Sequence, residues 1–405
     1  MDFTFTEEQQ AATEAAKAVF SGVVPDGVPS PALVPGAVAE DIDRPLWAGL
    51  ASGDLLSLTL SPEHGGAGLD LVALCLVLRE SAKVLARVPL LETCAVAMAL
   101  QRYGNPRLAA ELLPRAGRGE LVLTAGANGR TGHDPAELAV TARREAAAGT
   151  DAGASAGAGA GSDGAGAGGG ADSDGGWVLD GTQSAVPWAQ AADWIAIPAH
   201  IDEGRAVVAL IQPAQDGVTL AEQVSTSGER FAEVRLESVR VDGQALIDEP
   251  GAWEWLRALL TTGTCALALG LGEAVLAMTS QYTGKREQFG FPVATFQSVA
   301  VQTADRYIDL RAMEVTLWQA AWRISTGAAG ALPAEGDIAV AKIWASDGVR
   351  RVVQTAQHLH GGFGADTDYP LHRFHAWAKQ IELSLGPAAA HEEALGDLLA
   401  AHLLG

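Results

Sequence analysis

Cysteine is scarce in this sequence. Only three cysteines occur among its 405 residues, and Cys75, Cys94 and Cys265 are widely separated. No cysteine–histidine spacing is typical of a zinc site, so we expect no structural zinc. Isolated cysteines in apolar segments are typical of small buried hydrophobic residues in a reducing compartment.

Basic residues are also few. The chain has 27 lysines and arginines against 49 aspartates and glutamates, which gives a net charge of −22. Nucleic acids and anionic membranes bind basic surfaces, so this charge balance argues against both as partners. An anionic ligand would need a local basic site instead.

Long apolar runs are absent as well. No stretch of 18 apolar residues is free of charge and glycine, and no basic N-terminal region precedes an apolar segment. We therefore expect a soluble, cytoplasmic protein with no signal peptide and no membrane partner. Apolar residues make up 48% of the chain, enough at this length for two or three domains with substantial cores.

The first third of the chain shows helical periodicity. The run Thr6-Glu-Glu-Gln9 is a capping box, which predicts a helix that continues through Phe20. A rigid turn is expected at 61–68. Further helices are expected at 46–52, 71–85, 92–103 and 106–115. Together these segments predict an N-terminal all-α domain over residues 1–118.

From residue 119 the pattern changes to short β-type runs separated by turn residues. Strands are expected at 121–124, 138–141, 177–179, 194–197, 206–211 and 233–236. They predict a central antiparallel β domain over residues 119–245. Residues 146–176 are almost entirely Ala, Gly, Ser and Asp and have no large apolar side chain before Trp177. Such a segment cannot offset its own ordering entropy, so we expect a disordered insertion at a hairpin tip.

The remaining residues, 246–405, are helical again. Helical segments are expected at 253–286, 294–326, 337–359 and 371–404, with a break in the last one near Pro387. Four long segments joined by short connections predict a C-terminal four-helix bundle. The expected fold is therefore an α+β protein of three domains: helical, β and helical.

Several short motifs follow one another along the chain. They are Pro62-Glu-His-Gly-Gly-Ala-Gly68, Leu179-Asp-Gly-Thr-Gln183, Arg286-Glu-Gln-Phe-Gly290, Phe296-Gln297 and His360-Gly-Gly362. Their joint order and spacing resembles the acyl-CoA dehydrogenase family over essentially the whole chain. The run from Asp366 to Gly386 is similar to subunits of actinobacterial heteromeric dehydrogenases that act on steroid side-chain thioesters.

This resemblance implies an FAD-dependent enzyme that desaturates an acyl-CoA between Cα and Cβ. In the family, a glutamate removes the α-proton while hydride passes to the flavin. The cofactor lies across a subunit interface: the flavin ring rests on the β domain of one subunit, and the pyrophosphate and adenosine reach the bundle of its neighbour. A flavoprotein is the implied electron acceptor.

Six residues match the family's contacts to the pyrophosphate and adenosine. Arg286 matches the arginine at the pyrophosphate, where a guanidinium binds two phosphate oxygens at once. Taken alone, Arg286 is better explained as a helix-end arginine paired with a surface acid. The other matches are an aromatic residue, a polar contact, a histidine where the family often has glutamine, and two glycines that admit a close ligand: Phe289, Gln297, His358, Gly361 and Gly362.

No metal site is expected. His358 and His360 are two residues apart, but no carboxylate or third ligand lies near them in the sequence.

The part of the site that would face the flavin ring departs from the family pattern. Where members have Thr-Glu-Pro followed by Gly-Ser-Asp, this chain has Thr124-Ala-Gly-Ala-Asn-Gly-Arg130. Where they have Lys-Ser-Trp-Ile-Thr or a similar run, it has Gln183-Ser-Ala-Val-Pro187. The resemblance therefore does not imply the usual contacts to the ring.

The catalytic glutamate of the family is also missing. Its usual position falls on Leu385, and the alternative position on the first bundle helix falls near Leu260. Leucine cannot accept a proton. Glu382, about one helical turn before Leu385, and Glu273 are the acids that we weigh as substitutes. A displacement of several ångströms disrupts proton transfer, so an exposed surface acid is the better explanation for Glu382.

We therefore expect the non-catalytic subunit of a heteromeric acyl-CoA dehydrogenase, an α2β2 assembly. The bundle of this chain would hold the ADP half of FAD, and a sister subunit would supply the ring pocket and the glutamate. The substrate would be a bulky CoA thioester such as a steroid side chain. Two alternatives stay open: a self-sufficient homomeric flavoenzyme with a displaced base, and a flavin-free scaffold subunit.

Overall fold

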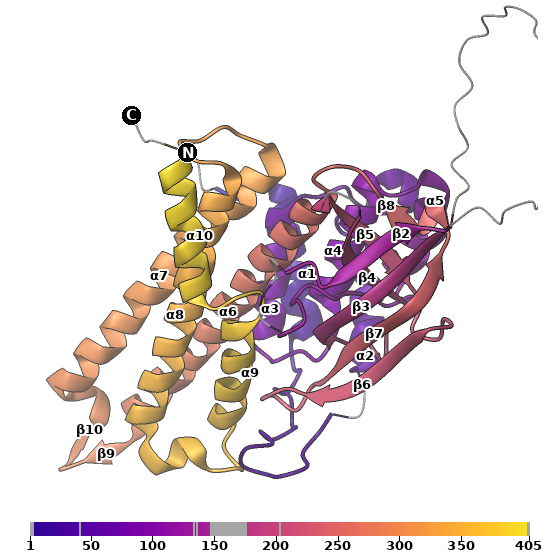
Figure 1. Cartoon of the computed structure of the whole chain (residues 1–405). Coiled ribbons are helices and arrows are strands. Elements are labelled where there is room, and N and C mark those ends of the chain that lie inside the picture. The colour runs from indigo at the N-terminus through magenta and orange to yellow at the C-terminus, as the bar shows by residue number, and fades with distance from the viewer. Residues whose placement is uncertain are drawn as a thin grey trace, which may run out of the picture.

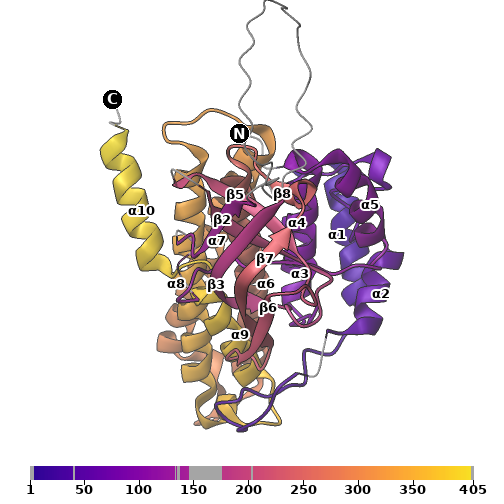
Figure 2. The ribbon, with the colours of Figure 1, turned by 45° about the vertical axis from the view of Figure 1, so that its right-hand side comes forward.

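The computed structural model describes residues 4–39, 42–132, 134, 137–145, 176–201 and 204–402. Helices form the first and last parts of the chain and a sheet forms the middle part (Figure 1). In Figure 2 the sheet lies toward the viewer, between the N-terminal helices and the C-terminal bundle. The expected order of helical, β and helical parts is confirmed.

The N-terminal part is helical, as predicted. Its capping box is present: Thr6 Oγ1 accepts a hydrogen bond from Gln9 N at 3.2 Å, and Gln9 Oε1 accepts one from Thr6 N at 3.0 Å. A 3₁₀ turn over Pro62–His64 occupies the expected rigid turn. The helices are α1 (Glu7–Phe20), α2 (Arg44–Ser52), α3 (Leu71–Ala82), α4 (Leu90–Tyr103) and α5 (Pro106–Gly117).

The central part is a single eight-stranded sheet. Its hydrogen-bonded order is β6-β7-β3-β2-β4-β5-β8, with β1 paired to β4 outside this path. The strands are β1 (Leu123–Ala125), β2 (Val140–Arg144), β3 (Trp177–Pro187), β4 (Trp194–His200), β5 (Ala206–Ile211), β6 (Val218–Val224), β7 (Arg230–Val241) and β8 (Leu246–Ile247).

The sheet is mixed rather than wholly antiparallel. Strand β1 runs parallel to β4, with Leu123 opposite Trp194, and β2 meets β4 in a parallel pairing of Thr141 with His200. The β2–β3 hairpin lies between β1 and β4 in sequence, and this long connection lets β4 return beside β1 in the same direction. All other strand pairs in this sheet are antiparallel.

Strands β2 and β3 form the hairpin that was expected around the Ala- and Gly-rich insertion. Arg144 pairs with Trp177, and Glu145 N donates to Gly176 O at 2.8 Å. The prediction of disorder concerns 146–176, and residues 146–175 lie outside the described residues. Strands β3 and β7 extend well beyond the predicted runs, because their polar and glycine residues hide the alternation, and the edge strand β6 was not predicted at all.

The C-terminal part contains the four expected helices and a fifth. The last predicted segment breaks at Pro387, as expected, and its two pieces form separate helices. A short unpredicted hairpin, β9 (Glu287–Gln288) and β10 (Phe291–Pro292), projects from one end of the bundle (Figure 1). The helices are α6 (Ala252–Lys285), α7 (Gln297–Thr326), α8 (Ala334–His360), α9 (Leu371–Leu383) and α10 (Ala388–Ala401).

Helix α6 is the central helix of the molecule. It is the one helix in the described part of the chain that is long and apolar enough to cross a membrane, but 78% of its most apolar window is buried inside the protein. A β-carbon at Gly270 would lie 1.9 Å from the backbone oxygen of Arg79 in α3. Glycine at this position therefore lets the two helices cross in direct backbone contact.

We predict that Gly270→Ala destabilises the chain by roughly 2–3 kcal/mol or more, because α3 and α6 would have to separate. The matched control is Gly284→Ala in the same helix, where an added β-carbon meets nothing within 4 Å. Alanine forms helices better than glycine, so the control should be neutral or slightly stabilising. Urea denaturation measures both. Equal stability of the two variants would contradict the proposed helix contact.

Candidate functional site

Arg286 lies at the surface, directly after the last turn of α6. Its backbone N–H donates to Tyr282 O at 2.8 Å and so ends the helix. Its guanidinium is exposed and makes no hydrogen bond or ion pair with any described residue. The explanation that Arg286 pairs with a surface acid therefore finds no support. An unpaired arginine at a fixed helix end is suited to hold an anionic group.

The hairpin after Arg286 places an aromatic side chain in solvent. Its two turn residues, Phe289 and Gly290, have φ angles of 55° and 80°. This is the pattern of a tight hairpin turn that normally prefers asparagine and glycine. Phe289 is 91% exposed, and its ring lies 6.3 Å from that of Phe296 in an edge-to-face arrangement. Strained backbone of this kind clusters at active sites and ligand-binding segments.

The glycine pair lies at the end of α8. Gly361 has a φ of 61° and a ψ of −140°, a conformation that only glycine adopts readily. A β-carbon at Gly361 or Gly362 would meet nothing within 4 Å, so open space lies in front of this backbone. Both glycines are exposed, as are the side chains of Gln297 and His358.

An aromatic cluster joins the Arg286 end of α6 to the glycine pair. Tyr282 lies one helical turn before Arg286. The centroid of its ring is 4.3 Å from that of His360 and 5.5 Å from that of Phe363, and it stacks on both rings. Tyr369 completes the cluster through its hydroxyl, 3.1 Å from His360 Nε2. Sequence reasoning missed this cluster, although Tyr282 shares a helix face with Arg286.

The two predicted motifs therefore meet on one surface. The unpaired Arg286, the open backbone at Gly361 and Gly362, and the exposed faces of Phe289 and Phe363 fit a diphosphate with an attached ring. No group of three or more possible metal ligands occurs among the described residues.

A second region of interest is a cavity between α4, α6, α9 and the β domain. Leu385 and Leu260 both line it, and both are buried. Leu385 and Leu260 correspond to the two positions at which family members carry the glutamate, so both positions line the same cavity and both are leucine. The cavity volume is about 100 Å³. A cavity of about 150 Å³ accommodates benzene, so a three-ring flavin does not fit in this cavity alone. A pocket of about 500 Å³ adjoins it and shares Asn128, Ala185 and Gln380 with it.

Leu385 lies in a turn whose backbone is held from several sides. Its φ is 58°, which is strained for a leucine. Its N–H donates to Asn128 Oδ1 at 2.9 Å, and its oxygen lies 2.8 Å from His391 Nε2. Burial lowers the pKa of His391 to about 4, so the ring is neutral at physiological pH and its Nε2–H is the donor.

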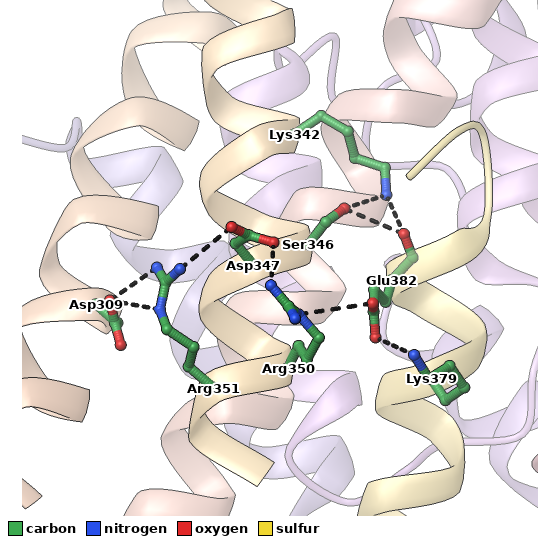
Figure 3. A network of polar contacts seen from close by, with 8 residues as sticks. All are labelled: Asp309, Lys342, Ser346, Asp347, Arg350, Arg351, Lys379 and Glu382. Atoms are coloured by element: carbon green, nitrogen blue, oxygen red, sulfur yellow. Dashed lines mark hydrogen bonds and ion pairs between the residues drawn. The ribbon is translucent and has the colours of Figure 1, made fainter. Parts of the chain in front are cut away.

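The helix before this turn ends on a buried lysine (Figure 3). Lys342 Nζ donates to the backbone oxygens of Ile381 at 3.2 Å and Glu382 at 3.1 Å, and to Ser346 Oγ at 2.8 Å. Burial lowers the pKa of Lys342 to about 8. This lysine satisfies carbonyl groups that the end of α9 would otherwise leave without partners.

Glu382 does not point into the cavity. Its carboxylate lies 2.8 Å from Lys379 Nζ and 3.8 Å from Arg350, in an ionic network across α8 and α9 (Figure 3). Its side chain is 14% exposed, so it is a partly buried ion-paired acid rather than the exposed surface acid that we expected. Glu273 is likewise paired, with Arg79 Nε at 2.8 Å. Neither acid lines the cavity.

The segments expected to face a flavin ring are hydrogen-bonded within the chain. Thr124 Oγ1 donates to Pro187 O at 2.7 Å, and the N–H of Ala185 donates to Gln223 Oε1 at 2.9 Å. Asn128 Nδ2 donates to Ala185 O at 3.2 Å. These three donors are already used, whereas the buried amide of Gln183 keeps both Nε2 and Oε1 without a hydrogen-bond partner among the described residues.

Sequence reasoning missed two acids that line the cavity. Burial raises the pKa of Glu92 to about 8, and the negative charge of Glu229 adds to this rise. Burial also raises the pKa of Glu229 to about 7, while Arg87 and Gln380 oppose the rise. Both acids lie in apolar surroundings far from each other in sequence, so only the fold reveals that they share a cavity.

These raised pKa values predict a pH dependence of stability. Between about pH 4.5 and 8 the folded chain keeps a proton on Glu92 that the unfolded chain releases, so stability falls as the pH rises through this range. Glu92→Gln should remove this contribution: the variant should match the wild type near pH 5 and exceed it near pH 8. Urea denaturation at both pH values tests this. A constant difference would contradict the assignment.

Comparison with known proteins agrees with this architecture. The acyl-CoA dehydrogenase N-terminal domain matches residues 6–120, and the acyl-CoA dehydrogenase C-terminal domain matches residues 260–399. The chain belongs to the acyl-CoA dehydrogenase family, whose cofactor is FAD.

Among its relatives is the acyl-CoA dehydrogenase FadE27 of Mycobacterium tuberculosis, 32% identical over 99% of each chain. The crystal structure of the ChsE4-ChsE5 complex from Mycobacterium tuberculosis contains a chain with 32% identity and a TM-score of 0.83, over 99% of each chain. A variant of the Tcur3481-Tcur3483 steroid ACAD is 33% identical with a TM-score of 0.82, over 98% of each chain. The resemblance to steroid-type heteromeric subunits is thereby confirmed.

Proposed function

We propose that this chain is the non-catalytic subunit of a heteromeric acyl-CoA dehydrogenase. Its bundle end binds the ADP half of FAD through Arg286, Phe289, Gln297, His358 and the Gly361–Gly362 backbone. A sister subunit supplies the flavin-ring pocket and the glutamate that takes the α-proton. When bound, FAD accepts the hydride from Cβ. The role of this chain is to hold and orient the diphosphate half.

One observation carries the proposal: Arg286 lies far from the cavity that Leu260 and Leu385 line, where the family would place its glutamate. Leu260 lies near the start of α6 and Arg286 follows its end. At about 1.5 Å per residue, about 39 Å of helix separates them. This exceeds the reach of one extended dinucleotide. A cofactor held by Arg286 would therefore direct its ring outside this chain, toward a neighbour.

Exposed apolar residues on the bundle support a neighbour at this surface. Val301, Ile308 and Val315 are 52%, 62% and 49% exposed and recur every seven residues along α7, so they share one face. Phe289 and Phe291 on the hairpin add exposed aromatic surface. Exposed apolar patches of this kind mark protein interaction sites.

The relatives support a different chain as that neighbour. The ChsE4-ChsE5 and Tcur3481-Tcur3483 structures are both named as pairs of components, and the second is named a steroid ACAD. From these two-component relatives we infer that this chain is part of an α2β2 assembly that acts in the cytoplasm on a steroid side-chain CoA thioester. A flavoprotein would accept the electrons.

The self-sufficient enzyme is the alternative that one observation favours. Glu92 and Glu229 line the cavity with raised pKa values, and such acids are typical of active sites. The small volume of the cavity and the ion pairs of Glu382 argue against it. The flavin-free scaffold is disfavoured because a scaffold has no use for the unpaired Arg286.

We predict that Arg286→Ala removes flavin from the complex formed with the sister subunit, because the diphosphate loses its cationic partner. The expected loss is at least about tenfold in FAD affinity, as for a charge-assisted contact of 1.5–3 kcal/mol. The 450 nm absorbance of the purified complex measures it. The control is Arg118→Ala, which removes an exposed arginine at the end of α5; the complex formed with this variant should retain flavin. Full flavin content in Arg286→Ala would overturn the proposal.

Leu385→Glu tests the cavity separately. It restores the family's carboxylate in the strained turn, yet the space beside it stays too small for a flavin ring. We expect no acyl-CoA dehydrogenase activity from this variant without the sister subunit. Turnover by the isolated variant, followed with an artificial electron acceptor, would show that the cavity still admits flavin and substrate.

Phe289→Asn should act in opposite directions on the chain and on the assembly. Asparagine tolerates the left-handed backbone at this position, so the isolated chain should become more stable by about 1 kcal/mol. Loss of the 91% exposed ring should weaken binding to the sister subunit. Thermal unfolding and analytical ultracentrifugation measure the two effects. Unchanged assembly would show that the hairpin tip lies outside the interface.

A further inference from the structure

The aromatic cluster lies between the two elements that the proposed function assigns to the diphosphate, namely the end of α6 and the turn after α8. His360 is at its centre and is 4% exposed. Its Nδ1 lies 2.8 Å from Ala356 O, and its Nε2 lies 3.1 Å from the Tyr369 hydroxyl. A carbonyl oxygen can only accept, so Nδ1 carries the hydrogen and Nε2 of the neutral ring accepts from Tyr369. Burial lowers the pKa of His360, which favours this neutral form.

Tyr369 is a rigid partner for His360, because its own backbone is held on both sides. Its N–H donates to Asp366 O at 3.1 Å, and its oxygen accepts from His372 Nδ1 at 2.8 Å. His372 belongs to α9 and is 4% exposed. The Tyr369 ring also packs on Phe363, with the two ring centroids 4.4 Å apart. The hydroxyl that binds His360 is therefore fixed by the loop before α9 and by α9 itself.

The glycine turn that follows His360 is held in shape by the chain itself. The N–H of Gly361 donates to the backbone oxygens of Gln357 and His358, and its oxygen accepts from Gln357 Nε2 at 3.0 Å. A β-carbon at Gly364 would lie 2.9 Å from the same side-chain amide, so the turn packs directly on Gln357. Gly361 is the next residue after His360, and a displaced His360 would therefore move the start of this turn.

The His360 ring also contacts the end of α6. Tyr282 stacks on it with a centroid distance of 4.3 Å and an interplanar angle of 22°. The backbone oxygen of Tyr282 accepts the N–H of Arg286, the residue that ends the helix. Arg286 and Gly361 are thereby joined through one stacked pair of rings. The position of the His360 ring sets the spacing between the unpaired arginine and the open glycine backbone.

We propose that His360 and Tyr369 are positioning residues for the ADP half of FAD. Their hydrogen bond holds the His360 ring, and the ring fixes the spacing of Arg286 and the glycine turn, between which the diphosphate binds. Neither residue needs to touch the cofactor. A site that is ordered before its ligand arrives binds more tightly, because binding no longer has to order it. The inference rests on the proposed function, since it takes the diphosphate as the ligand of this surface.

The test uses the flavin-free complex with the sister subunit, and the probes are FAD and ADP. Tyr369→Phe removes the hydroxyl and keeps the ring. We expect the Kd for FAD to rise about three- to tenfold, as for the loss of one buried hydrogen bond. ADP should compete with FAD, and its inhibition constant should rise by the same factor, because the defect lies at the ADP half. Flavin fluorescence measures both constants.

His360→Phe provides a second variant, since its ring can still stack on Tyr282 but makes no hydrogen bond. It should weaken FAD binding at least as much as Tyr369→Phe does. The double variant should bind no more weakly than His360→Phe alone, because the two residues act through one shared hydrogen bond. Tyr103→Phe in α4 is the matched control: it makes the same change at a half-buried tyrosine that packs on Trp255, and it should bind FAD as the wild type does.

A purely structural role would lower the Tm of both variants and leave both binding constants unchanged, which would overturn the inference. Additive losses in the double variant, or a weaker FAD affinity without a matching change for ADP, would overturn it too. The wild-type complex keeps the two proposals apart. If ADP competes with FAD there but both variants bind as the wild type does, only the positioning role fails. If ADP does not compete and Arg286→Ala keeps its flavin, the proposed function fails as well.

Discussion

The structure depends on how closely α6 packs against its neighbours. A β-carbon at Gly263 would lie 2.2 Å from Leu91 in α4, and one at Gly270 would lie 1.9 Å from the backbone of α3. These contacts fix α6 against the N-terminal helices along much of its length. Its first part then lines the cavity through Leu260 and Thr264, and its end presents Tyr282 and Arg286 at the surface. One helix thereby sets the positions of both candidate regions.

The turn at Leu385 is held in a strained conformation by its surroundings. Asn128 and His391 hold the two backbone groups of Leu385, and Lys342 holds the preceding helix end. Strained backbone persists where its surroundings fix it in this way. The side chain in this position is nevertheless a leucine, and Asn128 Nδ2 and the N–H of Ala185 on the facing segments are bound within the chain.

Much of the fold could be predicted from the sequence, because its helices are long, periodic and marked by capping and proline signals. The capping box at Thr6 and the break at Pro387 are both confirmed. The strands were harder. Residues such as Asp180 and Gly181 interrupt the apolar pattern of β3, and the pairing of β1 with β4 depends on a long crossover that leaves no local signal.

The residues of the candidate site likewise fall into those that could be predicted from the sequence and those that could not. Arg286, Phe289 and the glycine pair could be predicted because the motifs that carry them are contiguous in sequence, although their roles remain proposals. Glu92 and Glu229 could not be found, since nothing in the sequence relates α4 to the start of β7. The ion pair of Glu382 with Arg350 depends on the packing of α8 against α9, which periodicity alone does not specify.

The central claim is that this chain holds one half of a cofactor whose ring lies in another subunit. The visible absorption spectrum of the purified chain, recorded alone and after co-expression with its sister subunit, tests this most directly. The account predicts a colourless chain alone and a yellow complex with one FAD for each pair of subunits. A chain that is yellow alone, and is bleached by an acyl-CoA, would contradict it.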